Sequence, residues 1–173
     1  MKGMVIIMKS KKIATYGLLV ALAFIFSYIE RLIPIPYPVP GMKLGLANLV
    51  VITALYTMGI KEAFVLSLIR IFLVGFSYGN IFAMAFSLAG GLLSWLMMVI
   101  FYKTKLFSMV GVSIIGGVAH NIGQIIVAIL YLSNNAMVYY LPFLLISGVG
   151  SGALIGILGA MIVKILKKQS KEV

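Results

Sequence analysis

The stretch Gly116-Gly117-Val118-Ala119-His120-Asn121-Ile122-Gly123-Gln124 decides how this chain folds, because it sets polar side chains within an apolar run long enough to cross a bilayer. At roughly 100° per residue, His120, Asn121 and Gln124 fall within about a quarter turn of a helix. Unpaired polar groups in hydrocarbon cost several kcal/mol, so this arc is expected to face other helices or a cavity. Hydrogen bonds between helices are one explanation, but three such side chains on one face favour a buried small-molecule site.

The composition around this stretch is that of an all-α membrane protein. Hydrophobic residues make up 63% of the 173 residues and charged residues only 10%, which indicates transmembrane helices and leaves no room for a soluble catalytic module. The net charge is +11, but the basic residues lie at segment ends, which fits membrane orientation better than nucleic-acid binding. The absence of cysteine excludes disulfides, thiol catalysis and iron–sulfur ligation.

The apolar segments predict one six-helix transmembrane domain over residues 13–166, with basic cytoplasmic tails at 1–12 and 167–173. The spans are expected at about 13–33, 44–58, 63–77, 81–102, 110–132 and 138–166. Both termini are expected in the cytoplasm, because this arrangement leaves eleven lysines inside and only Arg31 and Lys43 outside. The polar arc then lies near the midplane, in a pocket entered from the outer side.

A proline-rich segment follows the first span. Pro34, Pro36, Pro38 and Pro40 stand at every second position, which removes backbone donors and holds the backbone extended. A plain connector between spans is one interpretation, but an apolar segment of this length favours a lid that folds back over the outer membrane face. Tyr37 in that lid is then placed to shield a ligand from water.

Charged and polar residues inside other spans extend the candidate site. Arg70 lies at the middle of the third span, where an arginine costs about 2.5–3.5 kcal/mol on insertion scales. A structural ion pair with Glu30 and an anion-binding role are both open, and the two are compatible if a ligand displaces Glu30. Asn48, near the outer end of the second span, is a further candidate for ligand binding.

Small residues indicate where helices approach one another closely. In the last span they recur at every fourth position and form one smooth ridge for helix packing: Gly148, Gly152, Gly156 and Ala160. The adjacent pair Gly90-Gly91 in the fourth span is interpreted as a packing feature in preference to space for a ligand. In the first span, Ala14, Gly17 and Ala21 form a small-residue stripe that allows another helix to approach, within this chain or from a partner.

Three stretches together resemble a known bacterial family. Residues 38–48 read PVPGMKLGLAN, residues 87–91 read SLAGG and residues 117–124 read GVAHNIGQ. They look like the signature stretches of the heptaprenyl diphosphate synthase component I family, also called the Gx transporter family, and the likeness extends over residues 12–164.

That family is similar in architecture to the substrate-binding S components of energy-coupling factor (ECF) vitamin importers. The resemblance implies a multi-pass protein of the bacterial cytoplasmic membrane, with six helices and a first loop that caps an outward-facing pocket. S components dock on a coupling subunit through an Ala-xxx-Ala pair in the first helix. Here the pair is Gly17 and Ala21, which departs from that pattern.

The leading hypothesis is therefore the substrate-binding subunit of an ECF-type importer for a small polar or anionic molecule, such as a vitamin or precursor. No phosphate-binding loop is present, so ATP hydrolysis would come from a partner ATPase pair. No metal or cofactor is expected. The predicted ligand-binding residues are Glu30, Tyr37, Asn48, Arg70, His120, Asn121 and Gln124.

Two alternatives to import are open. The first is a membrane accessory in quinone- or flavin-linked extracellular electron transfer, which is implied by the genes found beside members of the family. The second is a prenyl diphosphate synthase component. A catalytic role in prenyl elongation is excluded, because that reaction needs aspartate-rich clusters to hold magnesium and this chain has no aspartate.

Overall fold

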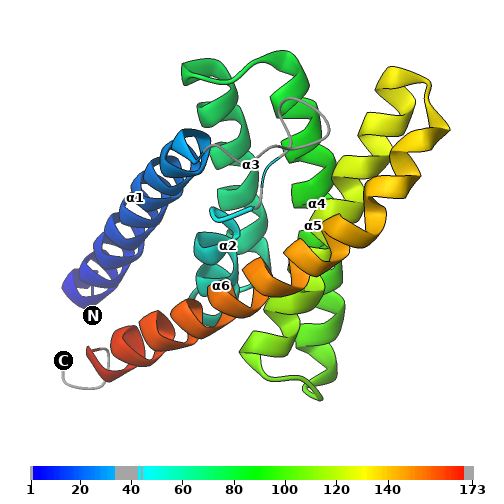
Figure 1. Cartoon of the computed structure of the whole chain (residues 1–173). Coiled ribbons are helices and arrows are strands. Elements are labelled where there is room, and N and C mark those ends of the chain that lie inside the picture. Colours follow the sequence, from blue (N-terminus) through cyan, green and yellow to red (C-terminus); the bar gives the residue numbers. More distant parts are fainter. Residues whose placement is uncertain (1, 34–42, 44, 170–173) are drawn as a thin grey trace.

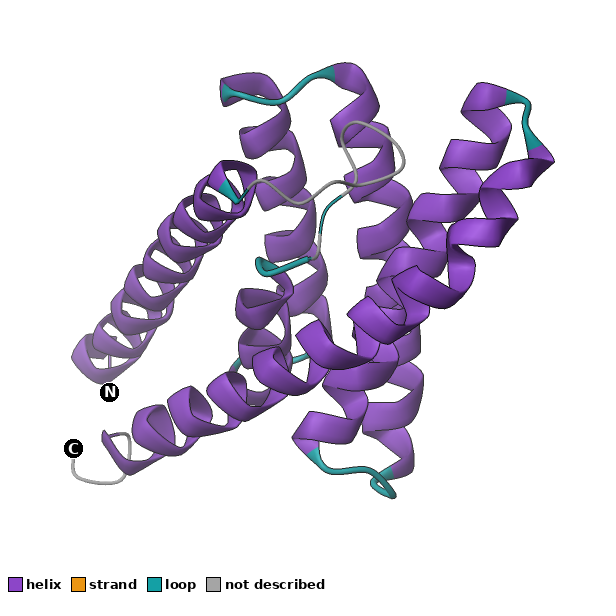
Figure 2. Cartoon of the chain, in the orientation of Figure 1, coloured by secondary structure: helices purple, strands orange, loops and turns teal. Residues whose placement is uncertain are grey.

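The computed structural model describes the backbone of residues 2–33, 43 and 45–169, and the side chains of residues 13–33, 43 and 45–168. The described part is helical throughout its regular structure, without a strand (Figures 1 and 2). Its elements are α1 (Lys2–Leu32), α2 (Asn48–Thr57), α3 (Ile60–Ser77), α4 (Ile81–Thr104), α5 (Met109–Leu132), the 3-10 helix η1 (Asn135–Tyr140) and α6 (Leu141–Gln169). The predicted proline lid, Tyr37 included, lies outside the described residues.

Four segments are long and apolar enough to cross a membrane, which confirms the prediction of an all-helical membrane protein. They are Ile13–Leu32, Ile81–Thr104, Met109–Leu132 and Asn135–Lys168. The other two helices do not meet that description. The 10-residue α2 is about 15 Å long, half the thickness of the hydrocarbon core, and α3 carries charged side chains at both its start and its middle. The number of spans and the orientation of the termini stay predictions.

The shortness of α2 has a local cause. The expected span began near residue 44, but Gly45 has a φ of +86°, which lies in the left-handed region and cannot continue a helix. Gly59, with a φ of +118°, separates α2 from α3. The helix between the two glycines therefore covers only residues 48–57 of the predicted span 44–58.

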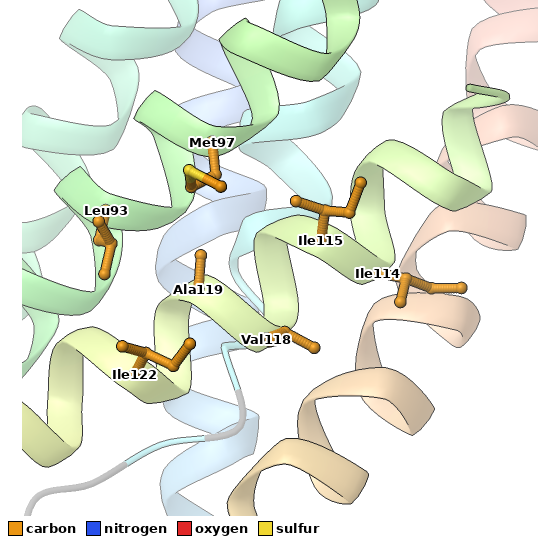
Figure 3. A pocket seen from close by; sticks show the side chains of 7 residues that line it. All are labelled: Leu93, Met97, Ile114, Ile115, Val118, Ala119 and Ile122. Carbon is orange, nitrogen blue, oxygen red and sulfur yellow. The ribbon is translucent and has the colours of Figure 1, made fainter. Parts of the chain in front are cut away.

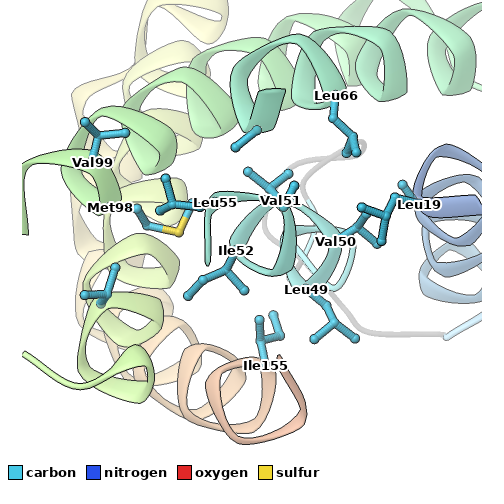
Figure 4. Close-up of a cluster of buried hydrophobic side chains, with 14 residues drawn as sticks. Leu19, Leu49, Val50, Val51, Ile52, Leu55, Leu66, Met98, Val99 and Ile155 are labelled. Carbon is cyan, nitrogen blue, oxygen red and sulfur yellow. The ribbon is translucent and has the colours of Figure 1, made fainter. Parts of the chain in front are cut away.

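Helix α2 is the centre of the hydrophobic core. Its side chains are apolar on every face, which is typical of a helix surrounded by protein. Figure 4 shows Leu49, Val50, Ile52 and their neighbours on α2 enclosed by side chains of α1, α3, α4 and α6. The enclosing residues include Leu19 from α1, Leu66 from α3, Met98 from α4 and Ile155 from α6.

Helices α5 and α6 are in direct backbone contact along what we call the α5–α6 seam. A Cβ atom built on Gly152 would lie 2.7 Å from the Cα of Ile114, and one built on Gly156 would lie 2.7 Å from the Cα of Val110. A Cβ atom built on Gly148 would lie 2.9 Å from the carbonyl oxygen of Gly117. These three members of the predicted ridge therefore face α5, and Ala160 is half-buried one turn further along α6.

The end of α1 is fastened to the end of α3. Arg31 donates a hydrogen bond to the carbonyl oxygen of Tyr78, and the Tyr78 hydroxyl donates to the carbonyl oxygen of Phe24 at 2.9 Å. The Tyr78 ring also meets the rings of Phe24 and Tyr28 edge-on. These contacts fix the last turns of α1, and with them the position of Glu30.

Candidate functional site

Two residues of the connection between α1 and α2 are held inside the bundle. The backbone N–H of Gly45 donates to Glu30 Oε1 at 2.5 Å, and the backbone N–H of Lys43 donates to Gln124 Oε1 at 3.1 Å. A Cβ atom on residue 45 would also come within 3.0 Å of the Asn48 amide and 3.2 Å of the His120 ring. The connection is therefore anchored to α1 by Glu30 and to α5 by Gln124, and position 45 requires glycine.

His120 and Gln124 lie one turn apart on α5 and bond to each other. Their Nε2 atoms are 2.7 Å apart. Because the amide nitrogen of Gln124 carries only donors, Nε2 of His120 must accept, and we assign the ring proton to Nδ1. His120 is only 2% exposed, and its Nδ1 points toward Gly90 on α4, where a Cβ atom would lie 2.9 Å away.

Arg70 enters the same region from α3. It is 4% exposed, and its Nη2 atom lies near Gly91, 3.8 Å from where a Cβ of that residue would be. Arg70 interacts electrostatically with Glu30 and His120. Thus two adjacent glycines of α4 face the two cation-forming side chains of the site, His120 from α5 and Arg70 from α3.

Most of the hydrogen-bonding capacity that is unused in the protein interior lies in this one region. Among the described residues, the buried side-chain atoms without a hydrogen-bond partner are Ser27 Oγ, Glu30 Oε2, Arg70 Nε, Arg70 Nη2 and His120 Nδ1. Folded proteins pair nearly all of their buried polar atoms, and exceptions call for an explanation. We refer to Glu30, Lys43, Arg70, His120 and Gln124 as the polar cluster.

Lys43 belongs to this cluster although the sequence placed it in an outer loop. It interacts electrostatically with Glu30 and Arg70, and it lines a narrow cleft between α3 and α4 together with Val74, Gly75 and Ser87, among others. Burial lowers the pKa of the Lys43 ammonium, and the nearby carboxylate of Glu30 opposes that shift. A lone lysine in the apolar run after the prolines was the only signal that the sequence offered.

The remaining predicted site residues separate into three groups. Asn48 is buried beside the polar cluster and donates to Ser94 Oγ at 3.5 Å. Asn121 lies on the seam side of α5, where its amide donates to the carbonyl oxygen of Leu144 on α6 at 2.6 Å. The stripe expected to dock a partner is exposed on α1, and nothing lies within 4 Å of a Cβ atom built on Gly17.

A second feature is an apolar pocket of about 350 Å³ between α4 and α5 (Figure 3). It is lined by Leu93, Met97, Ile114, Ile115, Val118, Ala119 and Ile122. At 100° per residue, Val118 and Ile122 lie on the side of α5 opposite His120. This pocket is therefore separate from the polar cluster, and its lining suits hydrocarbon and not a polar solute.

The described residues contain no group of three or more histidine, cysteine, aspartate or glutamate side chains that could hold a metal ion.

Four membrane-length helical segments around a buried polar cluster define the class of protein: a helical membrane protein with an internal polar site. The chain belongs to the heptaprenyl diphosphate synthase component I family, whose profile matches residues 19–162. This confirms the family predicted from the three sequence stretches. No curated protein matches the chain, and no solved structure does.

Proposed function

We propose that this chain is the substrate-binding membrane subunit, similar to an S component, of an ECF-type importer for a small polar or anionic molecule. The observation that carries the proposal is the buried guanidinium of Arg70, whose Nε and Nη2 donors have no partner among the described residues. A buried cation without a partner is costly. An anionic ligand that binds at this position would satisfy both donors.

A structural role for Arg70 requires an ion pair, and the geometry gives that role little support. Glu30, the acid that interacts electrostatically with Arg70, directs Oε1 to the backbone of Gly45, and its Oε2 has no hydrogen-bond partner among the residues described. Glu30 therefore anchors the loop and leaves the Nε and Nη2 atoms of Arg70 unpaired. Displacement of Glu30 is then not required for an anion to reach Arg70.

The transport cycle in this proposal begins when ligand enters from the outer side and binds to Arg70 and His120. Because Lys43 and Gly45 are bonded to side chains of the same cluster, a ligand in the cluster lies beside the loop that contains them, and the proline segment of that loop is the proposed lid. A coupling subunit and an ATPase pair then reorient the pocket. Ala14, Gly17 and Ala21 are exposed on α1, as docking on that coupling subunit requires.

The path of the chain supports six crossings with both ends on one side. Successive long helices run in alternating directions, and the start of α1 lies at the same end of the bundle as the end of α6 (Figure 1). In this proposal α2, which the other helices bury, belongs to the second crossing, and α3, whose outer face is exposed and apolar, makes the third. Arg70, which is 4% exposed, then stays away from lipid, as membrane energetics demand.

A non-catalytic component of a prenyl diphosphate synthase is the second candidate. The description of the family favours it, and so does the apolar pocket between α4 and α5, which would accept part of a hydrocarbon chain. Against it stands the separation of that pocket from Arg70, because one prenyl diphosphate would have to reach both.

Native mass spectrometry of gently purified protein tests the proposal. We expect the wild type to retain a small molecule, and Arg70→Ala and His120→Ala each to lose it while expression and helical content are unchanged. Lys61→Ala, which removes an exposed cation from the same helix as Arg70, is the control and retains the molecule. Normal retention in both site variants would refute the site.

Co-purification separates the two candidate functions. An importer subunit is expected to purify from native membranes with an ATPase pair and a membrane coupling subunit. Binding of farnesyl diphosphate, without those partners, would instead favour the prenyl synthase component.

A further inference from the structure

The unpaired atoms of the polar cluster define the chemistry of the group that would satisfy them. Nε and Nη2 of Arg70 lie on the same edge of the guanidinium, and this edge forms two parallel hydrogen bonds with a carboxylate or phosphate. Both atoms are buried and without a partner among the described residues. The complementary group therefore presents two adjacent acceptor oxygens.

The other two atoms set a further requirement. Glu30 Oε2 has no hydrogen-bond partner in the part of the chain that the structure describes, and a carboxylate oxygen can only accept, so the ligand must bring an N–H or O–H donor to it. Nδ1 of His120 carries the ring proton in the tautomer assigned above, but it faces Gly90, whose backbone interacts with the ring, so the requirement comes from Glu30. An anion without its own donor would leave Glu30 unsatisfied and would face it with like charge.

The charge of the cluster limits the charge of the ligand. In their ordinary ionised forms, Lys43 and Arg70 carry two formal positive charges and Glu30 carries one negative charge, so the formal sum is one positive charge. A single carboxylate balances that charge, whereas a phosphate monoester carries about 1.5 to 2 negative charges at pH 7. The balance therefore favours a carboxylate over a phosphate.

We infer that the ligand is a compact organic monoanion in which a carboxylate binds Arg70 and a neighbouring hydroxyl or amine hydrogen is donated to Glu30, as in a small hydroxy acid. This inference rests on the proposed function and adds the substrate class to it. Glu30 is then the residue that sets specificity. It accepts a hydrogen bond from the ligand, and it repels a ligand that carries a second negative charge at that position.

The substitution Glu30→Gln tests this role without loosening the loop. Glutamine keeps an Oε1 acceptor for the Gly45 N–H, but it replaces the unpaired oxygen with a donor and removes one negative charge. The two probes are glycolate and oxalate, which are similar in size. Glycolate is a monoanion with a hydroxyl donor, whereas oxalate is a dianion with acceptor oxygens in place of that hydroxyl. We therefore expect the substitution to reverse the preference between them.

The measurement is the dissociation constant of each probe for the detergent-purified protein, determined by titration calorimetry. The wild type should bind glycolate at least about tenfold more tightly than oxalate, and Glu30→Gln should bind oxalate more tightly, because each mismatched probe leaves a buried polar group unpaired. The control is Glu62→Gln, the same chemical change at the start of α3, which should leave the preference of the wild type intact.

Arg70→Lys provides a second test that does not depend on the folding of Glu30→Gln. Lysine keeps the charge but loses the two parallel donors, so the affinity for both probes should fall by about tenfold while their order is unchanged.

A wild type that prefers oxalate, or a Glu30→Gln variant with unchanged preference, overturns the inference. The same holds if neither probe binds although the purified protein retains a native small molecule. If it retains none and binds no probe, the proposed function itself fails.

Discussion

The α5–α6 seam and the polar cluster both depend on glycines, but the glycines make room for different things. On α6, Gly152 faces the backbone of α5, with the nearest atoms at Ser113 and Ile114. On α4, Gly91 faces only side chains, those of Ile71, Ser67 and Arg70. A glycine against backbone serves close helix packing, whereas a glycine against polar side chains keeps space for those side chains.

Gly90 stands between these two cases. A Cβ atom there would lie 2.9 Å from the ring of His120 and 2.9 Å from its carbonyl oxygen. It therefore permits both the approach of α5 and the position of the imidazole. The two regions are thus expected to respond differently to the same glycine-to-alanine change, in stability at the seam and in ligand binding at the cluster.

The largest loss of stability is expected from Gly152→Ala. The added methyl group would lie 2.7 Å from Ile114 Cα and 2.8 Å from Ser113 O, and backbone atoms cannot move aside as a flexible side chain can. Overpacking of this kind costs about 1–3 kcal/mol. The measurement is the thermal unfolding midpoint of the detergent-purified protein, with ligand retention measured in the folded fraction, where we expect it to be unchanged.

Gly150→Ala is the matched control on the same helix. No atom lies within 4 Å of a Cβ at that position, and alanine is a better helix former than glycine by about 1 kcal/mol. The unfolding midpoint should stay equal or rise. Equal destabilisation by both changes would show that the seam does not depend on close backbone contact.

Arg70→Met makes the opposite prediction for the polar cluster. Replacing a buried charge with an apolar side chain of similar length is often neutral or stabilising by about 1–4 kcal/mol, so the variant should unfold at an equal or higher temperature while losing its ligand. A structural ion pair with Glu30 predicts the reverse, because breaking a buried pair costs about 3–5 kcal/mol. The unfolding midpoint therefore decides between the two roles of Arg70.

Comparing Gly90→Ala with Gly91→Ala distinguishes displacement of the His120 ring from the effect of an added methyl group on α4 in general. At position 90 the methyl group meets the His120 ring and its backbone at 2.9 Å, whereas at position 91 the nearest atom is the flexible tip of Ile71 at 3.0 Å. We expect Gly90→Ala to reduce ligand affinity by about tenfold or more, since a shift of about 1 Å in a binding group has effects of this order. Gly91→Ala should have a smaller effect. Equal affinities would mean that His120 does not contact the ligand.

Sequence reasoning identified most side chains of the polar cluster for a simple physical reason. Arg70, His120 and Gln124 are polar groups within apolar helices, and the cost of exposing them to lipid directs them inward whatever the details of packing. It could not find Lys43, because that contact depends on the path of a connection and not on helical periodicity. It interpreted Gly90-Gly91 as packing, which agrees with the backbone contact of Gly90 but not with the side chains that face Gly91, since glycine alone does not reveal whether its neighbour is backbone or side chain.

Asn121 shows a further limit of that reasoning. Helical spacing put it on one arc with His120 and Gln124, but an arc of about a quarter turn is wide enough for its edges to face different helices. The structure divides the arc, with His120 and Gln124 toward the polar cluster and Asn121 toward α6. Only the positions of the neighbouring helices make that division.

The smallest expected effect belongs to Asn121→Ala. The change removes the hydrogen bond to Leu144 O, and interhelical hydrogen bonds in membrane proteins contribute about 0.6 kcal/mol on average, so the unfolding midpoint should fall slightly while ligand retention is unchanged. Asn135→Ala, at an exposed position at the start of η1, controls for loss of an asparagine in general. If Asn121→Ala lost the ligand without losing stability, Asn121 would belong to the polar cluster and not to the α5–α6 seam.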